Sequence, residues 1–398
     1  MRVGYVVVGE NLVRSGILRG QVITMVKYLK ALKGVDRVRV MWWGHPLMLF
    51  RERSLYRELK REFAQYGVSL MCYPLAGSFK WGYVMVGIVV LNVVPLLIWE
   101  VLTKRISILQ CRSYLAGWGG LLVGKFLKVK VIFDPRGPYP EEMVVNHHWK
   151  ENGLSYRLWK RIERLIVQLS DSTIGVTRDW VSYYRGIGSR SVFMVINRSD
   201  TQLASQIPLP ESPQNEWRLV FIGEMDTQWY HPQYVIGDVV PLLKQYPQFL
   251  LVLVTRKPSS WIIDNSRVPE EFKEKISVIS ASPNEISTIL SQGHFGLITG
   301  RFLGEVFPVK TGEYLAAGLP LVVSPQVGET LTSLVKKHKL GAVVDFQRGE
   351  GFELIEEMVK DYPLWSQRCR QYALKRLDIS TTARHYYRIY RTLLSRSN

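Results

Sequence analysis

The sequence predicts an α/β protein of two domains, each built around a largely parallel β-sheet. Three observations lead to this fold class. Short apolar runs alternate with segments of helix length along the chain, which is the pattern of βα units. The stretch 201–216 contains three prolines and no apolar period, and as a linker it separates two such series. A chain of 398 residues is also long for a single hydrophobic core.

The first series occupies residues 1–200 and begins with a short apolar strand that ends in glycine. A loop rich in glycine and arginine follows, and then a helix with apolar periodicity near 21–32. Ligands of doubly wound sheets bind at the carboxyl ends of strands, so we expect this loop to face a ligand. The strands of this domain are expected at residues 3–8, 38–42, 68–73, 106–111, 129–133, 173–176 and 192–196.

Residues 81–99 form an apolar segment with no charged side chain in nineteen residues. A bilayer-spanning helix needs about 20 such residues. A spanning helix would place the strands before and after it on opposite sides of a membrane, where they could not share a sheet. Asn92 and Pro95 also disfavour a span. We therefore expect a helix that is buried in the domain or dips into a membrane interface, for which Trp81 and Trp99 at its ends are suited.

The second series occupies residues 217–380, and a last helix covers 381–398. In that helix Tyr386, Tyr387 and Tyr390 form an aromatic stripe among arginines, which indicates packing against another part of the protein. The strands of the second domain are expected at residues 219–222, 249–254, 276–279, 295–298, 321–323 and 342–344.

The positive charge is concentrated in the first half of the chain. The chain carries 52 basic and 34 acidic side chains, and residues 1–200 hold 30 of the basic and 14 of the acidic ones. Such a field attracts a membrane surface, a phosphorylated substrate or nucleic acid. The sequence has no zinc-ligand spacing and no aromatic RNA-binding signature. We expect an anionic membrane surface or a lipid-linked phosphate, and no nucleic acid; a basic surface that serves only solubility is the alternative.

The cysteines and the first residues bear on the compartment. Cys72, Cys111 and Cys369 are odd in number and widely spaced, which predicts a reducing compartment with no disulfide framework and no metal site. Residues 1–10 lack the long apolar core and the small-residue cleavage site of a signal peptide. We expect a cytoplasmic protein, peripheral on the inner face of the cell membrane.

The stretch 304–320, GEVFPVKTGEYLAAGLP, combines several charged side chains with helix signals. Glu305 and Glu313 are separated by seven residues, and Lys310 lies between them. The Phe-Pro pair predicts a helix start, and the Gly-Leu-Pro run predicts its end. The helix N-terminus and Lys310 would attract a diphosphate, and the two carboxylates would accept hydrogen bonds from sugar hydroxyls beside it. An amphipathic helix with solvated charges is the alternative.

This stretch resembles the E-x7-E signature of the group 1 (family four) retaining glycosyltransferases of the GT-B fold, including the trailing EYLAAGLPLVVS. The resemblance implies two Rossmann-like domains that face each other across a cleft, with a C-terminal helix that crosses back to the first domain. It implies that Glu305 contacts the donor sugar and that Glu313 contacts the ribose of a nucleotide sugar. The sugar would be transferred with retention of configuration, without a metal and without a cofactor other than the nucleotide-sugar substrate.

The phosphates of the donor need positive charge. The family commonly has an arginine and a lysine after the first strand of the second domain, whereas this chain has Glu224 there. We expect Arg256, Arg301 and Lys310 to supply the charge, because they follow strand ends and arginine binds phosphate well. The donor-binding candidates are Gly16, Arg256, Arg301, Glu305, Phe307, Lys310 and Glu313.

Loops of the first domain supply the acceptor-binding and catalytic candidates. The family carries small residues in the first loop, for which Ser15, Gly16 and Gly20 are candidates, and usually a histidine-containing turn where this chain has DPRG. No catalytic histidine therefore carries over. The catalytic candidates are Asp134, Arg136 and Glu305, and the acceptor-binding candidates are Ser15, Arg112 and Glu142. An Asp-Arg ion pair that only fixes the loop is the alternative for Asp134 and Arg136.

These features together predict a retaining glycosyltransferase. It would move a sugar from a nucleotide sugar, bound by the second domain, to a glycan acceptor, bound by the first. A lipid-linked acceptor in bacterial surface polysaccharide assembly fits the basic half and the apolar segment. Two alternatives are a nucleotide-sugar epimerase of the same fold, which would need no acceptor, and a basic nucleic-acid-binding protein, whose binding would depend steeply on salt.

Overall fold

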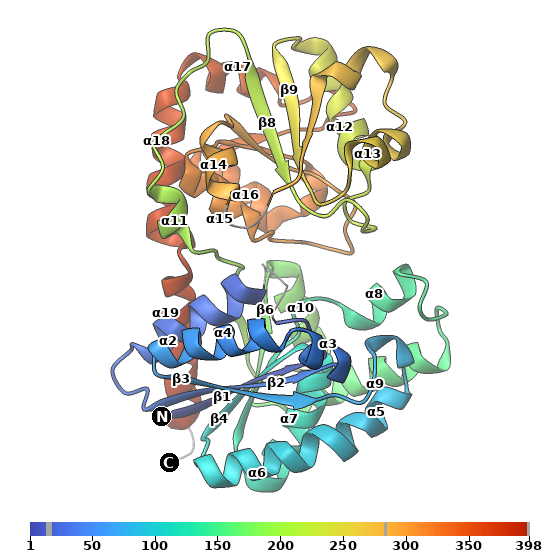
Figure 1. Cartoon of the computed structure of the whole chain (residues 1–398), viewed down its shortest axis with the longest axis vertical. Helices are drawn as coiled ribbons and strands as arrows, with labels where there is room; N and C mark the ends of the chain where they lie inside the picture. The colour runs from blue at the N-terminus through green and yellow to red at the C-terminus, as the bar shows by residue number, and fades with distance from the viewer. Residues whose placement is uncertain (13–17, 282–284, 396–398) are drawn as a thin grey trace. The chain divides into compact units, whose positions relative to one another are not determined.

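The computed structural model describes residues 1–12, 18–281 and 285–395. The chain forms two compact units (Figure 1). The first comprises Met1–Ile196 together with Ser380–Asn398, and the second comprises Asn197–Ile379. Each unit contains one parallel sheet with helices on it, which confirms the predicted α/β fold class.

The first unit has a seven-stranded sheet of order β3-β2-β1-β4-β5-β6-β7 with every pairing parallel. The order reverses at β1, so the loops after β1 and β4 leave the sheet in different directions and frame the place where doubly wound sheets bind ligands. The strands are β1 (Arg2–Val8), β2 (Arg37–Gly44), β3 (Val68–Pro74), β4 (Ile108–Arg112), β5 (Lys130–Asp134), β6 (Ser172–Gly175) and β7 (Val192–Met194).

Helices cover both faces of this sheet; α5, α6 and α7 lie on one face and α2 and α4 on the other (Figure 1). The helices of the unit are η1 (Arg19–Thr24), α2 (Met25–Lys30), α3 (Pro46–Arg51), α4 (Arg53–Gln65), η2 (Phe79–Trp81), α5 (Val84–Ile88), η3 (Val89–Val93), α6 (Val94–Lys104), α7 (Ser113–Leu127), α8 (Tyr139–Val145), α9 (Leu154–Leu169), α10 (Arg178–Gly186) and α19 (Ile379–Ser395).

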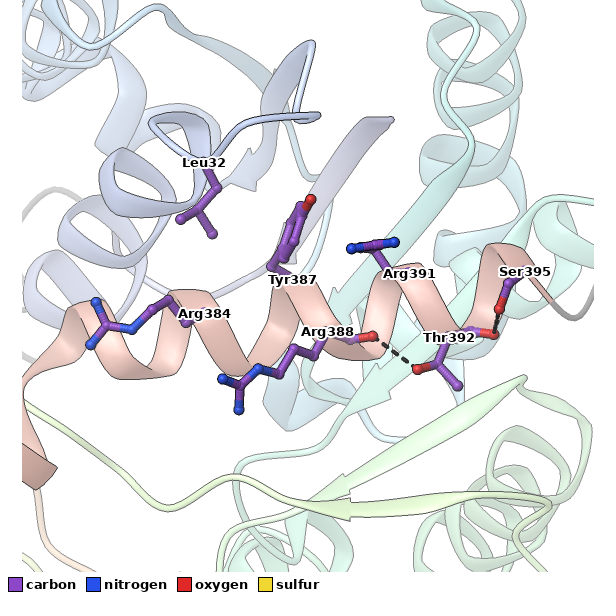
Figure 2. Close-up of a pocket in the computed structure, with 7 residues that line it drawn as sticks. All are labelled: Leu32, Arg384, Tyr387, Arg388, Arg391, Thr392 and Ser395. Carbon is purple, nitrogen blue, oxygen red and sulfur yellow. Dashed lines mark hydrogen bonds between the residues drawn. The ribbon is translucent and has the colours of Figure 1, made fainter.

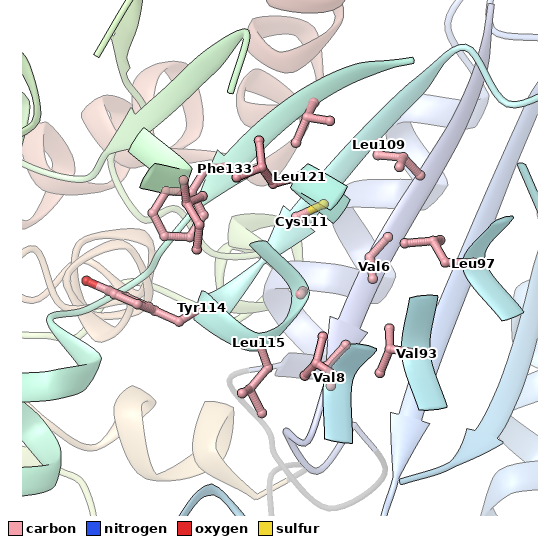
Figure 3. Packing of buried hydrophobic residues seen from close by; sticks show 14 of the residues in the cluster. Val6, Val8, Val93, Leu97, Leu109, Cys111, Tyr114, Leu115, Leu121 and Phe133 are labelled. Atoms are coloured by element: carbon pink, nitrogen blue, oxygen red, sulfur yellow. The ribbon is translucent and has the colours of Figure 1, made fainter. Parts of the chain in front are cut away.

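The core of the first unit lies between the sheet and helix α7 (Figure 3). Glycines on α7 let the helix approach the strands closely. A Cβ atom on Gly120 would lie 2.1 Å from the Cys111 sulfur, and one on Gly117 would lie 2.7 Å from the ring of Phe133. The side chains of Cys111 and Phe133 fill the space that Gly120 and Gly117 leave. This packing explains the glycines in an otherwise apolar helix.

The apolar segment forms one continuous helical rod, α5-η3-α6. Met85, Val89, Val93, Leu97 and Val101 are all buried in the core, so the buried positions recur every four residues. A regular α-helix would drift away from such a repeat, and the wider π-helical turn of η3 corrects the drift. The opposite side of the rod is exposed. The helix is therefore neither fully buried nor free of the domain.

Helix α19 belongs to the first unit from Ser380 onward. Its aromatic stripe is buried there. The Tyr386 hydroxyl donates to Asp134 of β5 at 2.9 Å, and the Tyr390 hydroxyl donates to Gln110 of β4. The two rings stack with centroids 6.1 Å apart. The last helix is thus tied to the central strands by polar as well as apolar contacts.

The second unit has a six-stranded parallel sheet of order β10-β9-β8-β11-β12-β13. The strands are β8 (Trp217–Ile222), β9 (Phe249–Val254), β10 (Ile276–Ile279), β11 (Phe295–Ile298), β12 (Leu321–Val323) and β13 (Gly341–Val343). The helices are α11 (Thr201–Ser205), α12 (Pro232–Gln245), α13 (Ser259–Ser266), η4 (Glu270–Lys275), α14 (Ile286–Ser291), α15 (Lys310–Ala317), η5 (Pro325–Val327), α16 (Glu329–His338), α17 (Phe352–Lys360), α18 (Tyr362–Tyr372) and η6 (Ala373–Leu377).

The stretch 201–216, assigned to a linker by its prolines, packs on the second unit. It begins with the short helix α11, and the Thr201 hydroxyl donates to Asp378 at 2.9 Å. The Arg370 guanidinium donates to the carbonyls of Ile207 and Pro208 at 2.8 and 3.3 Å. These contacts hold the stretch against helices α15 and α18 of its own unit.

Candidate functional site

Helix α15 and the loops at the carboxyl ends of β8, β9 and β11 form the candidate donor site in the second unit. The helix begins at Lys310, two residues after the predicted start at Pro308. It ends as predicted at Gly318, whose φ of 85° is the left-handed C-cap conformation that favours glycine. The E-x7-E stretch therefore consists of a loop that carries Glu305 and a helix that carries Lys310 and Glu313.

The Lys310 ammonium group lies at the tip of β8. Its Nζ donates to the carbonyl of Ile222 at 3.1 Å and lies 3.7 Å from the ring centroid of Phe221 and 4.3 Å from that of Tyr230. Burial lowers the pKa of Lys310 to about 7, although nearby Glu313 favours the charged form. Among the described residues, no carboxylate forms an ion pair with this amine. It is a buried cation whose partners are one carbonyl and two aromatic faces.

Glu313 lies one helical turn beyond Lys310 and is half-buried. Burial raises the pKa of its carboxyl, and Lys310 opposes the shift. None of the residues that the structure describes donates a hydrogen bond to this carboxylate. Both of its oxygens are available to hydroxyl groups of a ligand.

Glu305 is buried and bound to the protein itself. It accepts hydrogen bonds from the backbone amide of Thr330 at 2.9 Å and from the Thr330 hydroxyl at 2.7 Å. Thr330 belongs to the first turn of α16, where unsatisfied amides favour a negative charge. Gly328 makes room for this contact, since a Cβ atom there would lie 2.3 Å from the Glu305 side chain. The two glutamates of the signature therefore differ: Glu305 caps a helix, whereas Glu313 receives no hydrogen bond from any residue that the structure describes.

The two arginines expected at the phosphates are paired with carboxylates. Arg301 makes two hydrogen bonds of 3.0 Å to Asp238 and one of 2.8 Å to Gln326. Arg256 is largely exposed and contacts Glu224 at 2.5 Å. Lys257 next to it contacts Asp226 at 2.9 Å, so the loops after β8 and β9 are joined by two ion pairs.

Phe307 is buried and supports the loop before α15. Its carbonyl accepts a hydrogen bond of 2.9 Å from the Asn197 side chain. Phe307, Lys310 and Glu313 thus lie at the start of α15, and Glu305 is bound at the start of α16. Arg256 and Arg301 lie on neighbouring loops of the same unit.

Asp134 and Arg136 of the first unit form a buried cluster. One Asp134 oxygen accepts hydrogen bonds from Arg136 at 2.8 Å, from Gln110 at 3.0 Å and from Tyr386 at 2.9 Å. Arg136 also donates to the Tyr386 hydroxyl at 2.9 Å and adopts a positive φ of 67°. These contacts join the loop after β5 to helix α19. Asp134 itself is fully buried.

Arg112 is the last residue of β4, and Glu142 lies in the first turn of α8. The Arg112 guanidinium contacts Glu10 at 3.1 Å and Gln21 at 3.0 Å. Burial, with contributions from Glu10 and Glu141, raises the pKa of Glu142 to about 7. Gly137 permits the position of this side chain, because a Cβ atom there would lie 2.5 Å from a Glu142 oxygen.

Two predicted residues, Ser15 and Gly16, lie outside the described residues. Gly20 lies on η1 with open space beside it. Sequence reasoning did not identify Glu10, Phe221, Tyr230 or Thr330, although each contacts a predicted site residue. Glu10 lies two residues after the end of β1, a position that the sequence indicates; the positions of the other three give no such signal.

A separate hollow of about 570 Å³ lies along α19 in the first unit (Figure 2). It contains none of the predicted site residues. Its lining consists of Leu32, Arg384, Tyr387, Arg388, Arg391, Thr392 and Ser395. In the described part of the chain, no group of three His, Cys, Asp or Glu side chains is arranged to hold a metal ion.

Solved structures that resemble the chain cover nearly all of it. HepE of Anabaena, in complex with UDP, has a TM-score of 0.68 at 11% identity, over 98% of this chain and 100% of that one. A glycosyltransferase from Rickettsia africae has a TM-score of 0.67 at 14% identity, over 99% and 98%. A putative UDP-N-acetylglucosamine 2-epimerase from Listeria monocytogenes has a TM-score of 0.52 at 10% identity, over 93% and 91%. No curated protein matches by sequence.

These structural likenesses identify the fold as GT-B, the two-domain architecture of many glycosyltransferases. Residues 216–360, most of the second unit, match the family of glycosyl transferases group 1. The E-x7-E stretch lies within this matched region.

Proposed function

We propose that the protein is a retaining glycosyltransferase that moves a sugar from a nucleotide sugar to a glycan acceptor. The observation that carries the proposal is the environment of Lys310. Its amine is buried at the tip of β8 with one carbonyl and two rings as partners, whereas Arg256, Lys257 and Arg301 are each neutralised by a carboxylate. A buried amine that forms no ion pair with any described carboxylate is suited to receive a diphosphate.

The donor would lie across the start of α15. Lys310 and the amides of the helix N-terminus would bind the diphosphate, and Glu313 would accept hydrogen bonds from the ribose. When the bond from the anomeric carbon to the diphosphate breaks, the diphosphate takes the electron pair and gains charge. Lys310 would stabilise that charge without a metal, in a site shielded from water. Arg256 and Arg301 would help to stabilise the diphosphate charge only if their ion pairs with Glu224 and Asp238 were broken.

The first unit would bind the acceptor. Arg112 lies at the carboxyl end of β4 and Glu142 in the first turn of α8, and a Glu142 carboxyl with a pKa of about 7 can both donate and accept a hydrogen bond at neutral pH. We take the acceptor to be a lipid-linked glycan in bacterial surface polysaccharide assembly, because the first half of the chain is strongly basic. The enzyme would then work in the cytoplasm, peripherally on the inner face of the cell membrane.

Nucleotide binding is the first test. UDP, GDP, ADP and dTDP would be titrated calorimetrically against wild type, Lys310→Met, Glu313→Ala and the control Lys257→Met, starting with UDP because similar folds have been solved with it. Lys310→Met and Glu313→Ala each lose a hydrogen bond to a charged group, so nucleotide binding should weaken about ten- to a hundredfold in each. Lys257 is paired with Asp226, so its variant should stay within about twofold. Absence of binding by every nucleotide, or equal loss in the control, would refute the proposal.

Product analysis separates transfer from the other functions. A transferase consumes the nucleotide sugar only with an acceptor and gives a product whose anomeric configuration, read by NMR, matches that of the donor. An epimerase would convert the donor to an isomer without any acceptor. A polyprenyl-diphosphate glycan should be a better acceptor than the same glycan without lipid, and EDTA should leave the rate unchanged.

A further inference from the structure

The rod α5-η3-α6 of the first unit has two different faces. One face is buried against the sheet, as described above. The other carries large apolar side chains in solvent: Leu91 is 81% exposed, Leu102 59% and Trp99 51%. Val84–Lys104 is long and apolar enough to cross a membrane by length and composition, yet only a third of its most apolar window is buried. Exposure of this much apolar surface on a folded domain indicates an interaction site.

A transmembrane position is incompatible with the contacts of the buried face. Glu100 is fully buried in an ion pair with Arg39 of β2, and the Tyr73 hydroxyl also donates to it. The carbonyl of Gly82, just before the rod, accepts a hydrogen bond of 2.9 Å from the buried Trp159 indole. Removing the rod from the sheet would leave a buried charge unpaired and open the core. The apolar face can therefore meet a partner only while the rod remains in the domain.

Helix α7 extends this apolar face. It packs beside α6 (Figure 1), and Phe126 in its last turn is 74% exposed. Lys125 and Lys128 flank Phe126 and are exposed as well. At the end of α6, Lys104 lies 5.7 Å from the ring centroid of Trp99. Apolar and basic side chains thus alternate along the ends of the two helices.

The charge of this stretch is mostly of one sign. Residues 79–130 contain seven basic side chains and a single acidic one, Glu100; of the basic side chains, Arg112 is buried and Lys130 pairs with Asp171. Because Glu100 is buried with Arg39, it leaves no carboxylate of this stretch on the surface. Apolar side chains, interfacial tryptophans and basic residues together are the combination that binds an anionic lipid surface.

We propose that the outer face, defined as the exposed sides of α5, η3, α6 and α7, docks on an anionic lipid bilayer. Leu91, Trp99, Leu102 and Phe126 would enter the boundary between headgroups and acyl chains, and the lysines would contact anionic headgroups. Apolar burial and charge attraction act together here, which is the combination that stable peripheral binding requires. The inference assigns a place to the membrane association proposed above and does not depend on the identity of the donor.

The test is binding of the full chain to vesicles of phosphatidylcholine alone and with 30% phosphatidylglycerol, measured by sedimentation at about 0.15 M salt, a condition in which surface charges are partly screened. Wild type should bind the anionic vesicles strongly and the neutral ones weakly. Leu102→Ser with Phe126→Ser should weaken anionic binding about tenfold or more. Lys125→Gln with Lys128→Gln should weaken it about fivefold per charge.

Matched controls lie elsewhere on the chain. Phe50 is 80% exposed and Leu364 54%, so Phe50→Ser with Leu364→Ser removes similar side chains from other surfaces. Lys336→Gln with Lys337→Gln does the same for charge on α16. Both controls should bind like wild type. Equal weakening in the controls, or no binding to anionic vesicles, would overturn the proposal.

Two further readouts separate this inference from its rivals. Size-exclusion chromatography should give the same oligomeric state for wild type and the Leu102→Ser, Phe126→Ser variant. A dimer that becomes a monomer would show instead that the face joins two copies of the chain. UDP titration of the same samples tests the donor site independently. A wild type that binds UDP but not anionic vesicles refutes only the docking face, whereas a variant that loses vesicle binding and keeps UDP binding supports it.

Discussion

The Glu305 carboxylate is held by Thr330, whose backbone amide and hydroxyl donate to it at 2.9 and 2.7 Å. The two residues are 25 positions apart, and both are buried. Glu305 thereby joins the loop after β11 to the N-terminus of α16, where a negative charge is favourable. The first carboxylate of the signature has a structural task in addition to any contact with a donor sugar.

This task predicts a stability effect for Thr330→Val. The carboxylate would lose a charge-assisted hydrogen bond in a buried place, so the free energy of unfolding should fall by about 1–3 kcal/mol. Thr332→Val is the control, because the Thr332 hydroxyl only bonds back to carbonyls of its own turn and should matter by less than about 0.5 kcal/mol. Denaturant titration measures both. Identical unfolding curves for wild type and Thr330→Val would contradict the role assigned to Glu305.

Lys310 predicts a pH dependence of stability. Its pKa is about 7 in the folded protein against an ordinary 10.5, so between these values the unfolded chain binds the proton that the folded chain has lost. The stability of wild type relative to Lys310→Met should therefore rise with pH from about 7 to about 10, by at most about 1.4 kcal/mol per unit. Below pH 7 the difference should be flat. Denaturant titrations of both proteins at four pH values measure this difference in unfolding free energy. A difference that does not change with pH would contradict the burial of the amine.

The same amine predicts how nucleotide binding changes with pH. A diphosphate favours the charged form of Lys310, so binding requires the protonated amine. The affinity of wild type for its nucleotide should fall as the pH rises above about 7, approaching tenfold per unit, whereas Lys310→Met should bind weakly and without this slope. Calorimetry in buffers of matched ionic strength measures this pH dependence of nucleotide affinity. Parallel pH profiles for the two proteins would remove Lys310 from the phosphate site.

The local pattern of the sequence was sufficient to locate the helices and strands that carry the site. The apolar runs located the strands, and Gly318 located the end of α15, because only a glycine adopts its positive φ easily. The spacing of Glu305 and Glu313 located the signature itself. These features depend on neighbours in the chain, and a single sequence contains them.

The partners of the site residues could not be predicted in this way. Asp238 neutralises Arg301 from 63 positions away, and Tyr386 meets Asp134 across 252 positions. The rings around Lys310 likewise come from β8 and the loop after it. Such long-range contacts decide which side chains form ion pairs. The sequence therefore predicts the same role for Arg256, Arg301 and Lys310, and only the structure distinguishes them.

Glu142 predicts an opposite pH dependence. Its carboxyl has a raised pKa of about 7 against an ordinary 4.5, so the folded protein keeps a proton that the unfolded chain loses in this range. Wild type should lose stability relative to Glu142→Gln as the pH rises from about 4.5 to about 7, and the difference should then stay constant. Glu151→Gln, at an exposed position, is the control, and thermal unfolding at several pH values measures the effect. A difference that is constant throughout would mean that Glu142 titrates normally.

The cluster of Asp134, Arg136 and Tyr386 predicts that one hydroxyl anchors α19. Tyr386→Phe removes a hydrogen bond to a buried carboxylate and the acceptor for Arg136, and should cost the first unit about 1–3 kcal/mol of unfolding free energy. Tyr387→Phe loses only a bond to the Lys33 carbonyl near the surface, and should cost less than about 1 kcal/mol. Hydrogen exchange of the α19 amides, read by mass spectrometry, should accelerate in the first variant much more than in the second. Equal exchange in both would mean that apolar packing of the tyrosine rings holds the helix, and that the Asp134 and Arg136 pair serves another purpose in the loop after β5.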